Sequence, residues 1–138
     1  MIRRTFRATS SPDQSRGLAR EVVAFLAGYI ADQNVLHDLD IMLTEACANV
    51  VRHAYGEGEG GLEVRLRAEL GIFVDLEIVD WGGGFGKGAR FENPGPESEG
   101  GRGLFIISML SDAVEIRTDG AENILAIHKQ IGKNAWKT

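Results

Sequence analysis

The chain has 138 residues, with 15 Lys and Arg against 20 Asp and Glu, so its formal net charge is −5. This length allows a hydrophobic core to form in a single domain, residues 1–138, without disulfides or a structural metal. The only cysteine, Cys47, excludes an internal disulfide and a cysteine-based zinc site. The excess of acidic residues argues against nucleic acid or an anionic membrane as a partner. No apolar run is as long as a membrane span, which requires about 18 residues. A cytoplasmic protein is therefore expected.

The spacing of apolar residues and glycines predicts a definite order of elements. Apolar residues three or four positions apart predict helices at residues 12–31, 36–55 and 104–110. Alternating or short apolar runs predict strands at residues 2–8, 62–67, 72–79, 114–117 and 124–127. A long glycine-rich loop is predicted at 80–103 and a frayed tail at 132–138. The order predicts an α+β two-layer sandwich, with helices on one face of a mostly antiparallel sheet.

Two polar residues stand out in the second predicted helix. Glu45 and Asn49 are four positions apart, so they share one helix face at a separation of about 6 Å. Nearly all their neighbours are apolar or small, and burial of an unpaired polar group costs several kcal/mol. An amide oxygen is a suitable Mg²⁺ ligand, and a carboxylate can accept a proton from a hydroxyl group. The alternative, that the two residues satisfy each other or a nearby backbone group, stays open at this point.

Asp80 directly follows the strand predicted at 72–79 and precedes a run of glycines that includes Gly82 and Gly84. This pattern places a hydrogen-bond acceptor beside bare backbone that a ligand can approach closely. A carboxylate in that position can accept a hydrogen bond from an exocyclic amino group such as that of adenine. An ordinary turn capped by Asp80 is the alternative interpretation.

A second glycine motif leads into the helix predicted at 104–110. Gly101, Arg102 and Gly103 lie at its start. Glycines at a helix N-terminus expose backbone N–H groups and the positive end of the helix dipole, which favours an anion site. The alternative is a flexible connector with Arg102 facing solvent.

In their order and spacing, these motifs resemble those of the GHKL (Bergerat-fold) ATPases, which have a histidine-kinase-like ATPase domain. Residues 44–55 are similar to the family's N-box, and Asp80-x-Gly82-x-Gly84 is similar to its first glycine box. Residues 101–107 are similar to its second glycine box. The ending His53-Ala54-Tyr55 is typical of the anti-sigma-factor serine kinases of bacterial partner-switching systems. The resemblance covers nearly the whole chain and implies a Bergerat-fold sandwich with a mixed, mostly antiparallel sheet.

The resemblance also implies ATP and Mg²⁺ as cofactors and gives roles to the polar residues. Asn49 would coordinate Mg²⁺, and Glu45 would act as the general base on a protein serine hydroxyl. Asp80 would bind the adenine amino group. Arg52 and Arg102 would be cations on the phosphate side.

The glycines complete the implied site. Gly82 and Gly84 would shape the base pocket, while Gly101 and Gly103 would meet the phosphates. The loop 86–100 would be the ATP lid. One departure from the family pattern is Ser98-Glu99, which stands where a basic residue is often found and bears on transfer efficiency or on the lid's partner contacts.

The function implied is that of an anti-sigma factor with ATP-Mg²⁺-dependent serine kinase activity. It would phosphorylate a STAS-type anti-sigma-factor antagonist on serine and sequester a sigma factor, and a homodimer is compatible with the resemblance. Two alternatives stay open: a non-catalytic ATP-binding module that captures a protein partner, and an ATPase domain from a histidine-kinase system. P-loop, Rossmann and ordinary protein-kinase motifs are absent from the sequence.

Overall fold

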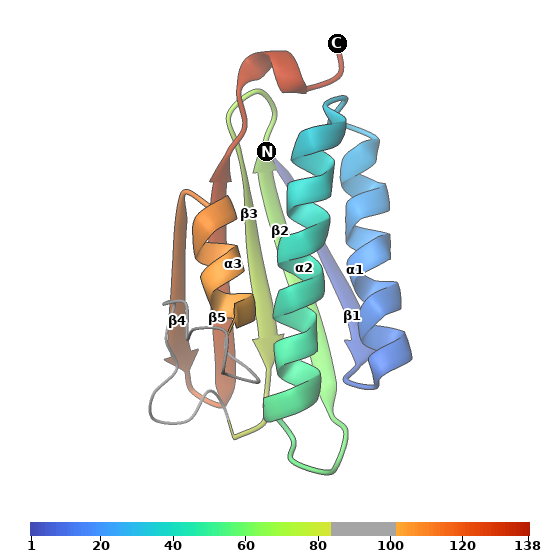
Figure 1. Cartoon of the computed structure of the whole chain (residues 1–138), viewed down its shortest axis with the longest axis vertical. Helices are drawn as coiled ribbons and strands as arrows, with labels where there is room; N and C mark the ends of the chain where they lie inside the picture. The colour runs from blue at the N-terminus through green and yellow to red at the C-terminus, as the bar shows by residue number, and fades with distance from the viewer. Residues whose placement is uncertain (84–101) are drawn as a thin grey trace.

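Five strands form one sheet in the order β1-β2-β3-β5-β4 (Figure 1). The computed structural model describes residues 1–83 and 102–138 of the chain. The strands are β1 (Ile2–Thr9), β2 (Gly61–Glu69), β3 (Phe73–Asp80), β4 (Ala113–Asp119) and β5 (Glu122–Gln130). All four pairings of these strands are antiparallel, so the expectation of a mixed sheet is wrong for the described residues. The reason is the two-helix connection after β1, which returns the chain to the end where β1 exits, so that β2 runs back beside it (Figure 1).

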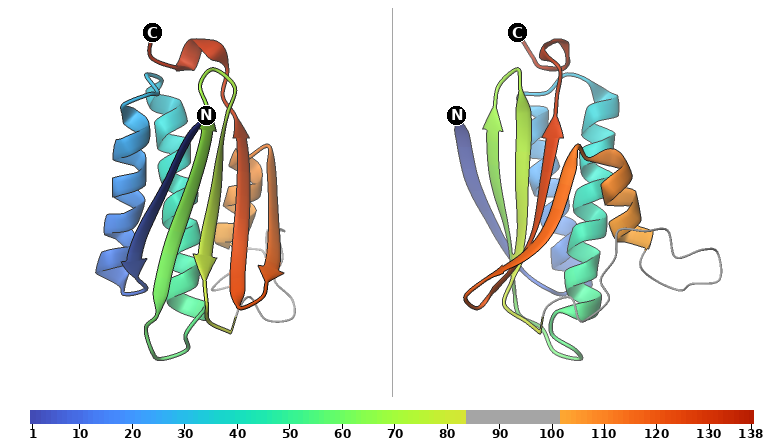
Figure 2. Two further views of the ribbon diagram at one scale, coloured as in Figure 1. Left: turned by 180° about the vertical axis from the view of Figure 1, so that it is seen from behind. Right: turned by 90° about the vertical axis from the view of Figure 1, so that its left-hand side faces the viewer.

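The helices α1 (Pro12–Ala27), α2 (Gln33–His53) and α3 (Arg102–Leu110) cover one face of this sheet (Figure 2). The start of α1 is as predicted, with Ser11 Oγ accepting a hydrogen bond from the Gln14 amide at 3.2 Å. The predicted end at residue 31 is wrong: the helix ends at Ala27, and Gly28 is its C-cap. α2 begins earlier than predicted, because Asp32 caps it by accepting hydrogen bonds from the next turn. The two-layer α+β architecture is confirmed.

The core lies between the helices and the inner face of the sheet. The apolar stripe predicted for α2 is fully buried and contains Leu39, Met42, Leu43, Ala46 and Val50. It packs against inward-facing residues of the central strands, which include Val64, Leu66, Leu76 and Ile78. This packing fixes the rotation of α2 and therefore the direction in which its polar residues point.

Cys47 is part of this core, and its reactivity gives a simple test of the packing. Burial raises the pKa of the Cys47 thiol to about 12, because the charged thiolate would lose its hydration. At pH 8 only about one thiol in 10,000 would then be ionised, and the thiolate is the reactive form. We expect Cys47 to react with a thiol reagent at least about 1,000-fold more slowly in the native protein than in urea. Equal rates in the two states would show that the packing of α2 is wrong.

The C-terminal residues are ordered, so the predicted frayed tail is wrong. A short 3₁₀ helix, η1 (Lys133–Ala135), leads to Trp136, which is buried. The Trp136 indole donates to the Ile131 carbonyl at 3.0 Å, and the Ala135 carbonyl accepts from the backbone between α1 and α2. Burial of the large indole supplies the free energy that holds this segment against the helices.

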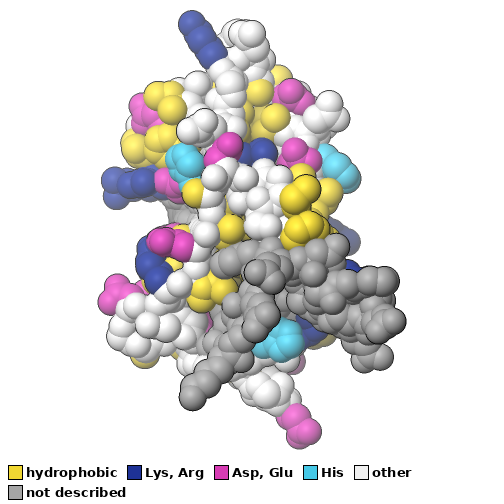
Figure 3. Space-filling view, turned by 60° about the vertical axis from the view of Figure 1, so that its left-hand side comes forward, with side chains coloured by type: hydrophobic (Ala, Val, Ile, Leu, Met, Phe, Trp, Pro, Cys, Tyr) yellow, Lys and Arg dark blue, Asp and Glu magenta, His cyan; other side chains and the backbone are white. Residues whose placement is uncertain are grey.

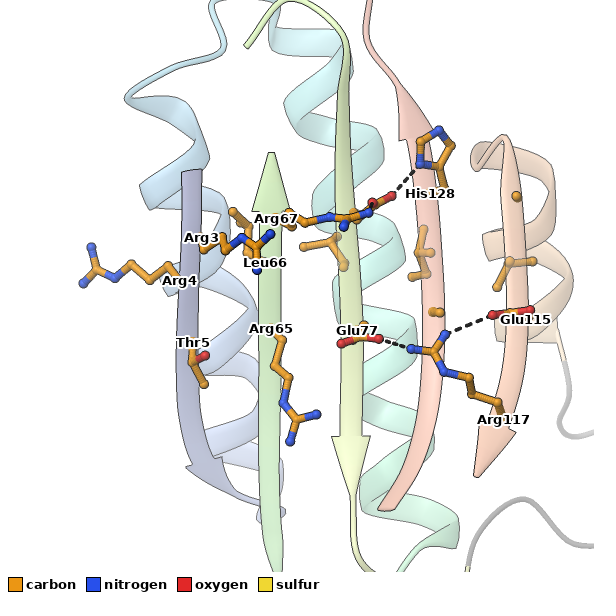
Figure 4. Close-up of a pocket in the computed structure, with 16 residues that line it drawn as sticks. Arg3, Arg4, Thr5, Arg65, Leu66, Arg67, Glu77, Glu115, Arg117 and His128 are labelled. Atoms are coloured by element: carbon orange, nitrogen blue, oxygen red, sulfur yellow. Dashed lines mark hydrogen bonds and ion pairs between the residues drawn. The ribbon is translucent and has the colours of Figure 1, made fainter. Parts of the chain in front are cut away.

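Among the described residues, no helix lies over the outer face of the sheet (Figure 2), and this face carries ion pairs across the strands (Figure 4). Arg65 bridges Glu63 and Glu122, and Arg117 pairs with Glu77 and Glu115. A hollow of about 640 Å³ lies over this face. None of the described residues predicted to carry chemistry lines this hollow.

The surface seen in Figure 3 mixes acidic, basic and hydrophobic side chains. In the described part of the chain, no helix has both the length and the hydropathy to cross a bilayer.

Candidate functional site

The C-terminal half of α2 presents a buried amide. Asn49 is only 5% exposed, and its Oδ1 accepts a hydrogen bond from Arg52 Nη2 at 2.9 Å. Its Nδ2 is buried and has no hydrogen-bond partner among the described residues. The amide therefore bonds to Arg52 and not to Glu45, contrary to the alternative in which the two residues satisfy each other. A buried polar group without a hydrogen bond costs about 1–3 kcal/mol, and Asn49 Nδ2 is such an unsatisfied donor among the described residues.

Glu45, one turn earlier on α2, lies against the start of α3. A methyl group placed on Gly103 would be only 2.7 Å from Glu45 Oε2 and 3.5 Å from its Cβ. The missing side chain at Gly103 thus lets the first turn of α3 approach the carboxylate. The first N–H groups of a helix have no partner within the helix, so donors and a carboxylate lie together here. α3 begins at Arg102 and not at residue 104 as predicted, which makes Arg102 and Gly103 part of the helix itself.

Asp80 ends β3 and is buried, with its carboxylate held by two donors. Its Oδ1 accepts from the Gly82 amide at 3.0 Å and from Asn123 Nδ2 at 2.9 Å. The first bond is the capped turn that the sequence offered as an alternative, so that interpretation is correct for Oδ1. Asn123 lies opposite Asp80 on β5 and also donates to the Gly82 carbonyl at 3.0 Å. The carboxylate is therefore fixed in orientation.

Sequence reasoning missed Asn123. It follows the turn between β4 and β5, where an asparagine has no distinctive pattern. Its partnership with Asp80 depends on the pairing of β3 with β5, two strands separated along the chain by α3 and β4. Only the register of that pairing could have indicated the contact.

Gly82 packs directly on the end of α2. A methyl group on Gly82 would lie 1.8 Å from the Ala54 carbonyl oxygen, and the Gly83 amide donates to that same oxygen at 2.7 Å. Close backbone approach thus explains the first glycine of the motif after Asp80.

Tyr55, the residue after Ala54, forms hydrogen bonds with two other segments at this end of the sheet. Its hydroxyl donates to the Gly61 carbonyl at 2.6 Å and accepts from the Trp81 amide at 2.9 Å. The start of β2 and the segment after β3 are therefore both joined to the end of α2 through one side chain.

The structure brings most of the predicted site residues to one end of the molecule. The C-terminal half of α2, the end of β3 and the start of α3 all lie in the lower part of Figure 1. They carry the described members of the predicted set, which are Glu45, Asn49, Arg52, Asp80, Gly82, Arg102 and Gly103. Gly84, Gly101 and the predicted lid 86–100 lie outside the described residues.

Comparison with known proteins agrees with this geometry. Residues 8–129 match the family model of the histidine kinase-like ATPase domain. The serine-protein kinase RsbW of Bacillus subtilis (strain 168) is 37% identical over 107 residues, which are 69% of this chain and 64% of that protein. The RsbW of Halalkalibacterium halodurans is 36% identical over 126 residues, 82% of this chain and 74% of that protein. The RsbW of Bacillus velezensis is 34% identical over 114 residues, 74% of this chain and 68% of that protein.

Proposed function

We infer the function from one premise: the chain belongs to the histidine kinase-like ATPase family. We propose that it is an anti-sigma factor with serine kinase activity, which uses Mg-ATP to phosphorylate a STAS-type antagonist on serine. The observation that carries the proposal is the buried Asn49 amide: its Oδ1 accepts from the exposed Arg52 side chain, which can release it to a metal, and its Nδ2 donor has no partner in the described residues. The similarity to serine-protein kinases named RsbW gives additional support.

The described residues fit a metal-bound nucleotide. Asn49 offers an amide oxygen for Mg²⁺, and the exposed Arg52 that now donates to this oxygen would turn to a phosphate instead. The absent side chain at Gly103 brings the first turn of α3 close to Glu45, and the backbone N–H groups of that turn, together with Arg102, would receive the phosphates. Gly101 would extend this phosphate-binding turn.

At the other end of the site, Asp80 would accept a hydrogen bond from the adenine amino group. The two bonds to its Oδ1 orient the carboxylate for that contact. Gly82 and Gly84 would line the base pocket, and residues 86–100 would form the lid.

Glu45 would act on the protein substrate. Bound Mg-ATP supplies the transferable phosphoryl group and the charge neutralisation that phosphoryl transfer requires. The Glu45 carboxylate would accept the proton that the serine hydroxyl loses as its oxygen bonds to the γ-phosphorus of ATP, while the bond from that phosphorus to ADP breaks and ADP leaves. Its place against the first turn of α3 holds it beside the phosphate-binding backbone.

Phosphorylation of the antagonist would change the partner that this chain binds. A phosphate adds about two negative charges to the antagonist at neutral pH, which disfavours its association with this acidic chain. The kinase released in this way holds a sigma factor and silences transcription. We place the switch in the cytoplasm and propose that the chain acts as a homodimer.

Replacement of Glu45 by glutamine tests the proposal. We expect Glu45→Gln to lower the rate of phosphate transfer to the antagonist about 100-fold or more, because the amide cannot accept the proton. ATP affinity should change little, since no role in nucleotide binding is assigned to Glu45. The measurement is transfer of label from ATP to antagonist serine, with calorimetry for ATP binding.

Glu57→Gln is the matched control, because Glu57 is exposed in the turn after α2. Transfer by Glu45→Gln at the wild-type rate would remove Glu45 from the mechanism. A wild-type protein that binds ATP but transfers nothing would favour the non-catalytic partner-capturing module. Label on a histidine would instead point to the histidine-kinase alternative.

A further inference from the structure

The short helix α3 is held at its C-terminal end by β5. Lys129 of β5 faces the helices, and its side chain is only 13% exposed. Its Nζ donates to the carbonyl of Leu110, the last residue of α3, at 2.7 Å. The same nitrogen lies 3.9 Å from Asp38 Oδ2 on α2. One ammonium group thus contacts both helices that form the candidate site.

The ammonium group of Lys129 is suited to stabilise the C-terminal end of α3. The last carbonyls of a helix have no partner within the helix, and a cation there also interacts favourably with the helix dipole. A lysine that is largely removed from water needs such partners. The two residues beside Lys129 hold the segment that follows α3: the His128 carbonyl accepts from the Asp112 amide, and the Gln130 amide donates to Asp112 Oδ2. Of these three neighbours, Lys129 is the one with a described ion pair to α2.

The contacts of Lys129 with Leu110 and Asp38 lie at the opposite end of α3 from Gly103 and Glu45. Asp38 and Glu45 are seven residues apart on α2, so they lie two turns apart on the same face. Leu110 and Gly103 likewise lie near opposite ends of α3. Lys129 therefore joins α2 and α3 at one end, while Glu45 and Gly103 are in contact at the other. Loss of the Lys129 contacts would allow α3 to tilt against α2 and change the separation of Glu45 from the first turn of α3.

We propose that Lys129 is a positioning residue for phosphoryl transfer: through Leu110 and Asp38 it sets the placement of the phosphate-binding end of α3 relative to Glu45. This inference rests on the proposed function of the Glu45–Gly103 site. It assigns a role to a residue that touches neither the nucleotide nor the substrate serine.

The test compares Lys129→Met, which keeps the length but loses the charge and the donor, with Lys129→Arg, which keeps both. We expect Lys129→Met to lower kcat for the antagonist about 10-fold and to weaken ATP binding about threefold, with KM for the antagonist unchanged. Lys129→Arg should restore most of kcat. Lys133→Met is the matched control, because Lys133 is an exposed lysine of η1, and it should equal wild type. Thermal unfolding is measured on every variant.

Wild-type kcat and ATP affinity in a folded Lys129→Met protein would overturn the inference, as would a Lys129→Arg protein no better than Lys129→Met. If Lys129→Met fails to fold, Lys129→Gln, which keeps a donor but no charge, is measured against Lys129→Arg by the same criteria. If the wild-type protein binds ATP but transfers no phosphate, the proposed function fails, and ATP affinity then decides whether Lys129 sets the placement of the start of α3. Equal affinity in Lys129→Met and wild type would then overturn this inference, and a threefold loss that Lys129→Arg reverses would support it.

Discussion

Replacement of Asn49 by alanine is expected to lower the affinity of the protein for Mg-ATP by about 1,000-fold, or about 4 kcal/mol. Alanine has no oxygen atom that could replace the Asn49 amide oxygen on the metal. The change also removes the acceptor that holds Arg52, whose Nη2 is 2.9 Å from Asn49 Oδ1. Calorimetric titration with ATP, once with Mg²⁺ and once with a chelator, measures the effect.

We expect Asn49→Ala to keep its stability, so that a loss of ATP affinity can be assigned to the missing ligand and not to unfolding. Nδ2 of Asn49 is buried without a partner in the described chain, so its removal relieves a penalty of about 1–3 kcal/mol that offsets the lost bond to Arg52. We therefore expect the free energy of unfolding to stay within about 1 kcal/mol of wild type while binding collapses. Asn34→Ala, at the exposed start of α2, is the control for both measurements.

Two results would contradict the role of Asn49. An unchanged affinity in the presence of Mg²⁺ would exclude it as a metal ligand. An equal loss with and without Mg²⁺, together with a lower unfolding temperature, would show that the substitution acts through the fold. Weak residual binding of metal-free nucleotide in a stable variant would agree with the proposal.

Local patterns predicted the parts of the fold that depend on local physics. The buried stripe of α2 follows from apolar spacing, and the strands follow from alternation, so both were found. Errors arose where distant segments meet. The C-terminal tail was predicted to fray because no pattern in residues 132–138 indicates the contacts of residues 135–137 with the segment between α1 and α2. The sheet was predicted to be mixed because the resemblance, and not the sequence, supplied that detail.

The candidate site divides in the same way. Glu45, Asn49 and Asp80 lie in short motifs with an unusual combination of polar residues and glycines, so they were visible in the sequence. Asn123 and Lys129 were not visible in the sequence. Both lie on β5, and their partners lie on β3 and α3, which only the tertiary fold brings next to β5. A polar residue that orients another one carries no local pattern of its own, and the pairing of β3 with β5 decides where it points.

Replacement of Gly82 by alanine is expected to destabilise the protein by about 3 kcal/mol or more, because the new methyl group would overlap a backbone atom. Its carbon would lie 1.8 Å from the Ala54 carbonyl oxygen and 2.4 Å from the carbonyl carbon, whereas an ordinary contact requires more than about 3.4 Å. Neither α2 nor β3 can yield easily, because Ala54 is buried and Asp80 is held by Asn123. A lower unfolding temperature, by about 10 °C for a domain of this size, is the measurement.

Gly83→Ala separates this overlap from any general intolerance of the glycine run. A methyl group on Gly83 has the Ala54 oxygen as its nearest described neighbour, at 3.9 Å, which is an ordinary contact. We expect this variant to lie within about 1 kcal/mol of wild type. The backbone shift forced by Gly82→Ala should also break the bonds that the Gly82 amide and carbonyl make with Asp80 and Asn123, so that ATP binding falls along with stability. If Gly82→Ala and Gly83→Ala were equally stable, the close packing of the first glycine motif on the end of α2 would be wrong, and with it the proposed place of Asp80 in a base pocket.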